Sequence, residues 1–136
     1  MLLGITEHTK GIAGTCEDIY FVNLKVVPRQ MFGIELMLGA EINILDYKGT
    51  LSLGKQYMKH LDLRIAGIHK MCYKPGTPRQ NTDAVLGAIA NPEVDIISHP
   101  DDGTCPSYQS SRRWWSPRGA SRSWCRYLTL RGCRHR

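Results

Sequence analysis

The chain has 136 residues, of which 42% are hydrophobic and 22% are charged. This composition suits one compact domain and excludes a disordered or collagen-like polypeptide. No run of about 18 apolar residues, the length of a membrane span, is present, because Glu35 and Glu41 interrupt the most apolar stretch. The start of the chain has neither a basic segment nor a small-residue cleavage site, so we expect a cytoplasmic protein without a membrane span.

The formal net charge of +6 combines two unlike segments. Residues 1–106 hold ten basic and twelve acidic residues, whereas residues 107–136 hold eight arginines and no acidic residue. We interpret the first segment as a folded domain and the second as an Arg/Ser/Trp-rich tail that is unstructured or read out of frame. Arginines with interleaved tryptophans also bind single-stranded nucleic acid, but the abrupt change of composition favours the frameshift.

Five cysteines are widely spaced and form no C-x-x-C pair. A disulfide framework or a zinc finger is therefore not expected, and we interpret these residues as incidental thiols.

Four short apolar runs recur along the first segment, at residues 2–6, 34–39, 63–68 and 94–98. Their length and their Gly, Pro or charged boundaries are typical of buried strands. Each run leads to a residue that can bind a metal, and these residues are 33, 28 and 30 positions apart: His8, Glu41, His69 and His99. A step of about 30 residues is typical of one strand and helix unit in a parallel sheet.

The intervals between the runs predict mainly helices. A helix is expected within residues 16–31, limited by Pro28, and another over residues 84–90, capped by Asn81 or Thr82. The interval 43–51 predicts a hairpin with its turn near Lys48 and Gly49, followed by a helix around residues 54–60. The chain is therefore predicted to have an α/β fold.

The carboxyl ends of parallel barrel strands meet at one face, where active sites lie. Four ligand-type residues at four such ends therefore predict a metal site, since imidazole and carboxylate ligands suit Zn²⁺ and Mn²⁺. The alternatives are histidines bonded to the backbone in the core or at helix caps, and a turn role for His99.

Four motifs carry a family resemblance: residues 5–8 (ITEH), 39–43 (GAEIN), 66–69 (AGIH) and 97–100 (ISHP). In order and spacing they resemble the inner motifs of the PHP family, named after polymerase and histidinol phosphatase, and most closely its small bacterial zinc phosphatases. The resemblance covers about residues 2–106. It implies a fragment of a distorted (β/α)7 barrel with three divalent metal ions, zinc first and manganese or iron as alternatives, that hydrolyses small phosphorylated substrates.

The resemblance also implies roles for single residues. Glu41 would bridge two metal ions, His69 and His99 would complete one of these sites, and His8 would bind the third ion. A metal-bound hydroxide would then attack the phosphorus atom. Lys70 would contact the substrate phosphate, although a solvated surface lysine is an equally good interpretation.

Two motifs of the family have no counterpart in this sequence: the opening D-x-H-x-H and the late S-D-x-H. The chain is therefore interpreted as an incomplete, truncated copy of a metal-dependent phosphoesterase. The alternatives are a non-catalytic remnant that binds metal and a nucleic-acid-binding protein acting through the basic tail. An incomplete barrel has unpaired strand edges, so we also expect oligomers or aggregates.

Overall fold

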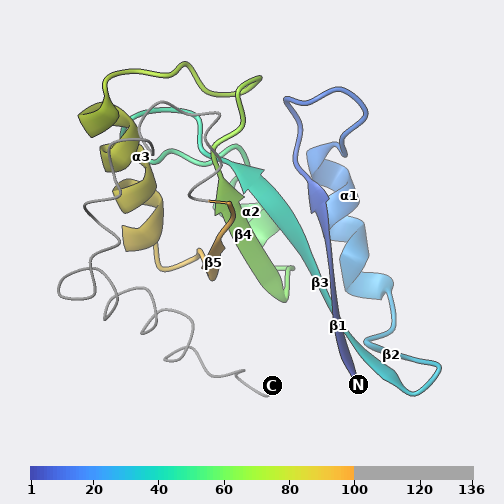
Figure 1. Ribbon diagram of the computed structural model, residues 1–136. Coiled ribbons are helices and arrows are strands. Elements are labelled where there is room, and N and C mark those ends of the chain that lie inside the picture. The colour runs from blue at the N-terminus through green and yellow to red at the C-terminus, as the bar shows by residue number, and fades with distance from the viewer. Residues whose placement is uncertain (100–136) are drawn as a thin grey trace, which may run out of the picture.

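A computed structural model describes residues 1–99, and the predicted tail over residues 107–136 lies outside them. The elements follow one another as β1 (Leu2–His8), α1 (Asp18–Asn23), the 3-10 helix η1 (Leu24–Val26), β2 (Gln30–Met31), β3 (Ile34–Asn43), α2 (Lys55–Met58), β4 (Leu63–Gly67), α3 (Pro78–Ala90) and β5 (Ile96–Ile97) (Figure 1). Within this part of the chain no helix is both long and apolar enough to cross a membrane. Its two cysteines, Cys16 and Cys72, are free thiols.

The strands form one sheet in the order β1-β3-β4-β5, and these four strands are parallel. The short β2 pairs antiparallel with the start of β3. A helix lies between each pair of successive parallel strands: α1 between β1 and β3, α2 between β3 and β4, and α3 between β4 and β5. The predicted α/β class is confirmed, and the arrangement is consistent with a fragment of an α/β barrel.

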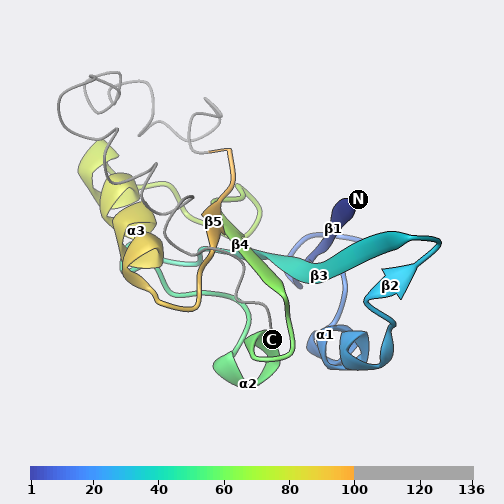
Figure 2. The ribbon, with the colours of Figure 1, turned by 90° about the horizontal axis from the view of Figure 1, so that it is seen from below.

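Side chains of β3 alternate between a helix-covered face and the opposite face, as the two-residue period of a strand requires. Leu38, Ala40 and Ile42 are buried in one core cluster with Phe21 of α1 and Met58 of α2. Both helices lie on the same side of the sheet (Figure 2). The intervening residues of β3 therefore face away from this core.

A second core cluster lies beneath α3, where Ala84 and Ala88 pack with Ala66 of β4 and with Val94. The turn after β3 comes unusually close to this helix. A Cβ atom added at Gly87 would lie 2.2 Å from the Lys48 carbonyl oxygen. The absence of a side chain at Gly87 thus lets the turn pack against the α3 backbone.

The helix expected within residues 16–31 is much shorter than that interval. It ends at Asn23 and tightens into η1, and the segment beyond Pro28 forms β2. Proline lacks the N–H that would continue the helix, and Arg29 instead donates hydrogen bonds to the carbonyl oxygens of Leu24 and Val27.

The predicted caps of the third helix are wrong. α3 begins at Pro78, and Thr77 caps it through a reciprocal pair of hydrogen bonds with Gln80. Asn81 lies inside the helix, fully buried, where it accepts a hydrogen bond from the Tyr73 hydroxyl. The earlier start follows from Pro78, which suits the first turn of a helix.

Two other boundaries also differ from expectation. β3 continues two residues beyond Glu41, because Ile42 and Asn43 still pair with β4. The predicted hairpin is reduced to one antiparallel bridge between Ile44 and Leu51, with its turn closed by a 3.1 Å hydrogen bond from the Gly49 N–H to the Asp46 carbonyl oxygen.

Candidate metal centre

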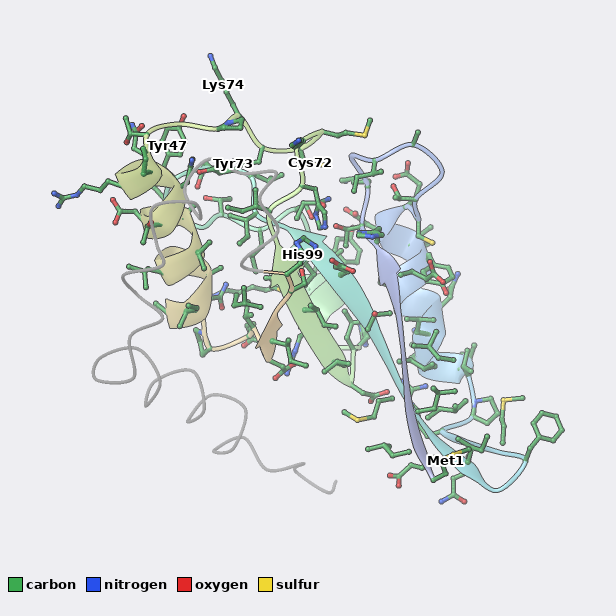
Figure 3. The ribbon with its side chains drawn as sticks, viewed as in Figure 1. Met1, Tyr47, Cys72, Tyr73, Lys74 and His99 are labelled. Atoms are coloured by element: carbon green, nitrogen blue, oxygen red, sulfur yellow. The ribbon has the colours of Figure 1, made fainter. Side chains whose placement is uncertain are left out.

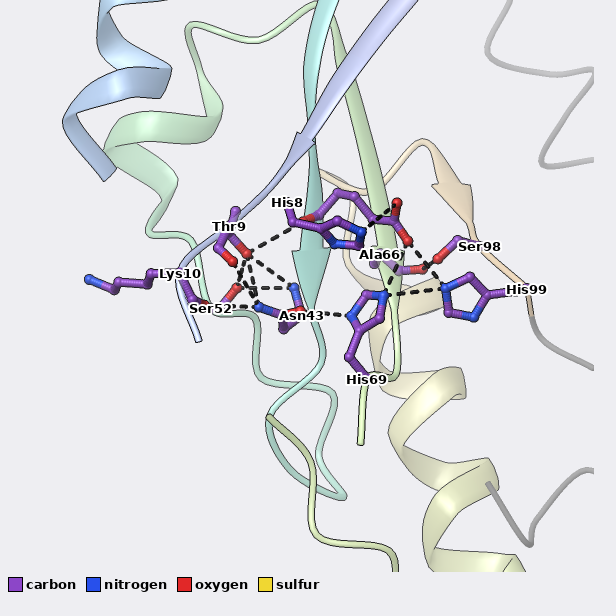
Figure 4. A network of polar contacts seen from close by, with 10 residues as sticks. His8, Thr9, Lys10, Asn43, Ser52, Ala66, His69, Ser98 and His99 are labelled. Carbon is purple, nitrogen blue, oxygen red and sulfur yellow. Dashed lines mark hydrogen bonds and ion pairs between the residues drawn. The ribbon is translucent and has the colours of Figure 1, made fainter. Parts of the chain in front are cut away.

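The four predicted ligands lie together at the carboxyl ends of the parallel strands. His8 ends β1, Glu41 lies near the end of β3, and His69 and His99 each follow their strand by two residues. His99 lies at this end of the sheet, whereas Met1 lies at the far end of β1 (Figure 3). Strands far apart in sequence thus bring three imidazoles to one carboxylate (Figure 4).

The Glu41 carboxylate is the centre of this cluster, and its two oxygens face different partners. Its Oε1 lies 3.2 Å from the Nε2 atom of His69 and 3.2 Å from that of His99. Its Oε2 lies 3.7 Å from His8 Nε2. The last contact follows directly from the sheet register, which pairs His8 with Glu41 on adjacent strands.

The spacing of these atoms fits a shared cation. Two ligands about 2.0 Å from one tetrahedral ion lie about 3.3 Å apart. Glu41 Oε1 and the Nε2 atoms of His69 and His99 form a triangle with edges of 3.2, 3.2 and 3.3 Å. The group of His8, Glu41 and His69 also offers ligand atoms that all lie within 4.8 Å of one another. This donor set could therefore hold a divalent metal ion.

The electrostatics of the cluster favour the ligand forms of His69 and Glu41, which are both partly buried. Burial lowers the pKa of His69 and outweighs the opposing attraction of the Glu41 carboxylate, so the neutral imidazole is favoured. Burial by itself would raise the pKa of Glu41, but hydrogen bonds from Ser98 and His99 and the fields of the other two histidines keep it below its usual value. One more polar atom is available, since His8 Nδ1 is buried without a hydrogen-bond partner in the structure.

Small residues make room for the imidazole rings. A Cβ atom added at Gly67, the last residue of β4, would lie 2.2 Å from Ser98 Oγ and 3.4 Å from a ring carbon of both His69 and His99. The His69 ring meets the rings of His8 and His99 edge to face, with centroids 4.9 and 5.1 Å apart. Gly67 therefore lies directly against the cluster, and its lack of a side chain leaves room for Ser98.

The sequence interpretation gave Asn43 no role, yet it contacts the cluster directly. Its Oδ1 lies 2.7 Å from His69 Nδ1, the ring nitrogen that points away from Glu41. Asn43 follows Glu41 by two residues and thus lies on the same face of β3. This two-residue offset is the signal by which the sequence could have indicated Asn43.

Lys70 is not part of the contact network. It is exposed on the turn after His69, and within residues 1–99 no hydrogen bond or ion pair joins it to the cluster. Its contact with a substrate phosphate stays a prediction.

The chain is similar to several bacterial proteins named as probable phosphatases. It is 43% identical over 105 residues to one from Clostridium novyi, which is 77% of this chain and 43% of that protein. It is 43% identical over 96 residues to one from Caldicellulosiruptor bescii (71% and 40%) and 41% identical over 106 residues to one from Thermoanaerobacter pseudethanolicus (77% and 43%). No protein-family profile matches the chain. The chain spans about two fifths of the length of these relatives.

Proposed function

We propose that this chain carries part of the active site of a metal-dependent phosphomonoesterase of the PHP type. The observation that supports it most is the Glu41 carboxylate, whose Oε1 faces the imidazoles of His69 and His99 and whose Oε2 faces that of His8. A carboxylate placed in this way suits a bridge between two cations. Similarity to proteins named as probable phosphatases supports the same reaction class.

In this proposal the side chains of the cluster have distinct roles. Glu41 would bridge two cations, His69 and His99 would complete one of these sites, and His8 would bind a third cation. Zinc is the first candidate, with manganese and iron as alternatives, because imidazole and carboxylate ligands suit all three. Divalent cations supply phosphoester hydrolysis with charge neutralisation of the phosphoryl oxygens and with a nucleophile at neutral pH.

The protein itself contributes a set of ligands at the carboxyl ends of the parallel strands. Three of the four follow or end parallel strands and Glu41 lies within one, so the sheet brings their donor atoms together. Lys70 is proposed to contact the phosphate of a small phosphorylated substrate, since it directly follows His69 and its ammonium group reaches solvent. We propose that residues 1–106, of which the structure describes residues 1–99, belong to the partial β/α domain that carries these groups.

The test is hydrolysis of an aryl phosphate by the full chain with added Zn²⁺ or Mn²⁺. We expect turnover that falls to background in Glu41→Ala and in His69→Ala. His60→Ala is the matched control, because His60 follows α2 and belongs to no contact of the cluster within the described residues. Equal turnover in Glu41→Ala and the unmodified chain would contradict the proposal. Stoichiometric metal without turnover would instead support a non-catalytic metal-binding remnant.

A further inference from the structure

We propose that Asn43 is a positioning residue that holds His69 as its Nδ1–H tautomer and so directs the Nε2 lone pair toward Glu41. The part of this inference that concerns metal affinity rests on the proposed function. Asn43 is the last residue of β3 and is fully buried. A buried amide must satisfy its hydrogen bonds within the protein, and its partners determine which way it points.

The orientation of the Asn43 amide is fixed by two backbone carbonyl groups. Its Nδ2 lies 2.9 Å from the Lys10 carbonyl oxygen and 3.3 Å from that of Thr9. Carbonyl oxygens only accept hydrogen bonds, so the atom that faces them must be the NH₂ group. The reverse orientation would place Oδ1 against both carbonyl oxygens. Asn43 Oδ1 therefore points toward His69.

This orientation decides which nitrogen of His69 carries the proton. Asn43 Oδ1 has no proton, so the 2.7 Å hydrogen bond must be donated by His69 Nδ1. A neutral imidazole has one N–H, so Nε2 then carries a lone pair. This lone pair faces Glu41 Oε1 at 3.2 Å, an arrangement that suits a cation between the two atoms, whereas without a cation the carboxylate competes for a proton on Nε2. Histidines that bind metals share this pattern, in which the second ring nitrogen donates to a fixed acceptor.

A buried polar network holds Asn43 itself in place (Figure 4). The Asn43 backbone N–H donates to Ser52 Oγ at 3.0 Å, and the Ser52 N–H donates back to the Asn43 carbonyl oxygen at 2.9 Å. The hydroxyls of Ser52 and Thr9 are 2.6 Å apart, and Thr9 Oγ1 lies 3.2 Å from Asn43 Nδ2. Because each of these groups is partnered, the network keeps the amide in one orientation.

The first experiment observes the tautomer directly. The full chain, metal-free and with ¹⁵N-labelled histidine, is studied by NMR at a pH well above the ordinary pKa of histidine, and His69→Gln assigns the signal. We expect the His69 proton on Nδ1 in Glu41→Ala, where no carboxylate competes for a proton on Nε2, and loss of this preference when Asn43→Ala is added. Asn43→Asp keeps an acceptor for His69 but replaces the NH₂ group that faces the Thr9 and Lys10 carbonyl oxygens, so it should also lower the melting temperature.

A matched control separates positioning from general loss of stability. Asn81 is also fully buried, but its partners are the Tyr73 hydroxyl and the Gly76 backbone, within α3 and the loop before it. Asn81→Ala should lower the melting temperature as Asn43→Ala does, yet leave the His69 tautomer unchanged. In zinc titrations we expect the affinity to fall about 10- to 100-fold in Asn43→Ala only.

The outcomes distinguish this inference from the proposed function. An Nε2–H tautomer in Glu41→Ala, or unchanged zinc affinity in a folded Asn43→Ala variant, would overturn the role of Asn43. A chain with the Nδ1–H tautomer that binds no metal would overturn the proposed function and leave the tautomer assignment intact. If Asn43→Ala does not fold, the tautomer of His69 in Glu41→Ala still decides the question.

Discussion

At the scale of single residues, the metal-ligand cluster depends on a small neighbouring residue, Gly67, as well as on the side chains proposed to bind metal. Gly67 leaves the space beside Ser98 that a methyl group would fill. In Gly67→Ala we expect displacement of the Ser98 hydroxyl, whose hydrogen bond helps to hold the Glu41 carboxylate, and this displacement lowers zinc affinity. Titration calorimetry on the folded variant measures this effect.

A double variant tests the steric origin of the effect. If the added methyl group acts by clashing with Ser98 Oγ, then Gly67→Ala combined with Ser98→Ala should bind zinc as well as Ser98→Ala alone. A double variant as weak as Gly67→Ala would show that the loss comes from elsewhere in β4.

The four residues of the cluster could be predicted because each follows an apolar run and is of a type that binds metals. Asn43 could not be predicted in the same way, because its role depends on the carbonyl groups of Thr9 and Lys10 across the sheet. The residue type of Asn43 alone does not indicate its role, because that role depends on which groups it contacts in the fold.

At the scale of elements, one arrangement recurs at the start of two strands. Asp62 precedes β4 and its carboxylate accepts a hydrogen bond from the Leu38 N–H of β3. Asp95 precedes β5 and accepts from the Arg64 N–H of β4. Each carboxylate is also bonded to an arginine, Arg29 or Arg64. Each aspartate thus ties the start of its own strand to the strand before it, at Leu38 in the middle of β3 and at Arg64 near the start of β4.

Asp95→Ala is expected to destabilise the fold by about 1–3 kcal/mol, because it leaves the Arg64 N–H and guanidinium without their partner. The Arg64 side chain makes two bonds to this carboxylate, at 2.8 and 3.0 Å. Glu93→Ala is the control, since Glu93 is more exposed and contacts Arg64 only at 3.4 Å; its cost should stay below about 1 kcal/mol. Equal costs in urea unfolding would contradict this account.

The turn after β3 predicts a dependence of stability on pH. Hydrogen bonds from the Thr50 hydroxyl and N–H and from the Lys48 N–H hold the pKa of Asp46 below its ordinary value. A carboxyl group with a lowered pKa stabilises the fold above its ordinary pKa, and this contribution disappears as the pH falls through the lowered value. The chain should therefore melt at a higher temperature than Asp46→Asn at neutral pH, and the difference should close in acid. A difference that stays constant down to strong acid would be inconsistent with this role.

The sequence predicts the positions of the strands and helices better than it predicts the residues at which they begin and end. All four parallel strands and three helical segments lie where the apolar pattern places them, because burial on a sheet or helix face requires that pattern. Their boundaries depend on pairing and capping. Thr77 and Gln80 move the start of α3 toward the amino end, and pairing with β4 extends β3 beyond Glu41.

At the scale of the whole molecule, β1 is an edge strand with apolar side chains in solvent. Leu2, Leu3 and Ile5 are 52%, 45% and 42% exposed, and in the described residues β1 pairs only with β3. Edge strands of this kind promote association. We expect the chain to sediment as oligomers or aggregates.

Charge at this edge should reduce the association. Leu3→Lys is predicted to shift the chain toward monomer in sedimentation velocity, because edge lysines oppose strand pairing. Leu86→Lys is the control, since Leu86 is equally exposed, at 45%, but lies on α3. A monomeric unmodified chain, or equal effects of the two substitutions, would contradict the role of the β1 edge.

The parallel α/β architecture of residues 1–99 is predictable, since the spacing of about 30 residues between ligand-type residues matches one strand and helix unit. The number of strands in a complete barrel does not follow from this chain, which spans about two fifths of its relatives. The pairing of β2 with β3 was missed, because a two-residue strand is too short to show a periodic pattern.

Metal content after equilibrium dialysis measures whether the Glu41 cluster binds a divalent metal ion. The full chain and Glu41→Gln are dialysed against Zn²⁺ and Mn²⁺ and analysed for bound metal, with His60→Ala as the control. We predict at least one ion per chain in the unmodified protein and in His60→Ala, and a loss of bound metal in Glu41→Gln. Equal metal content in all three proteins would show that the cluster is not the binding site.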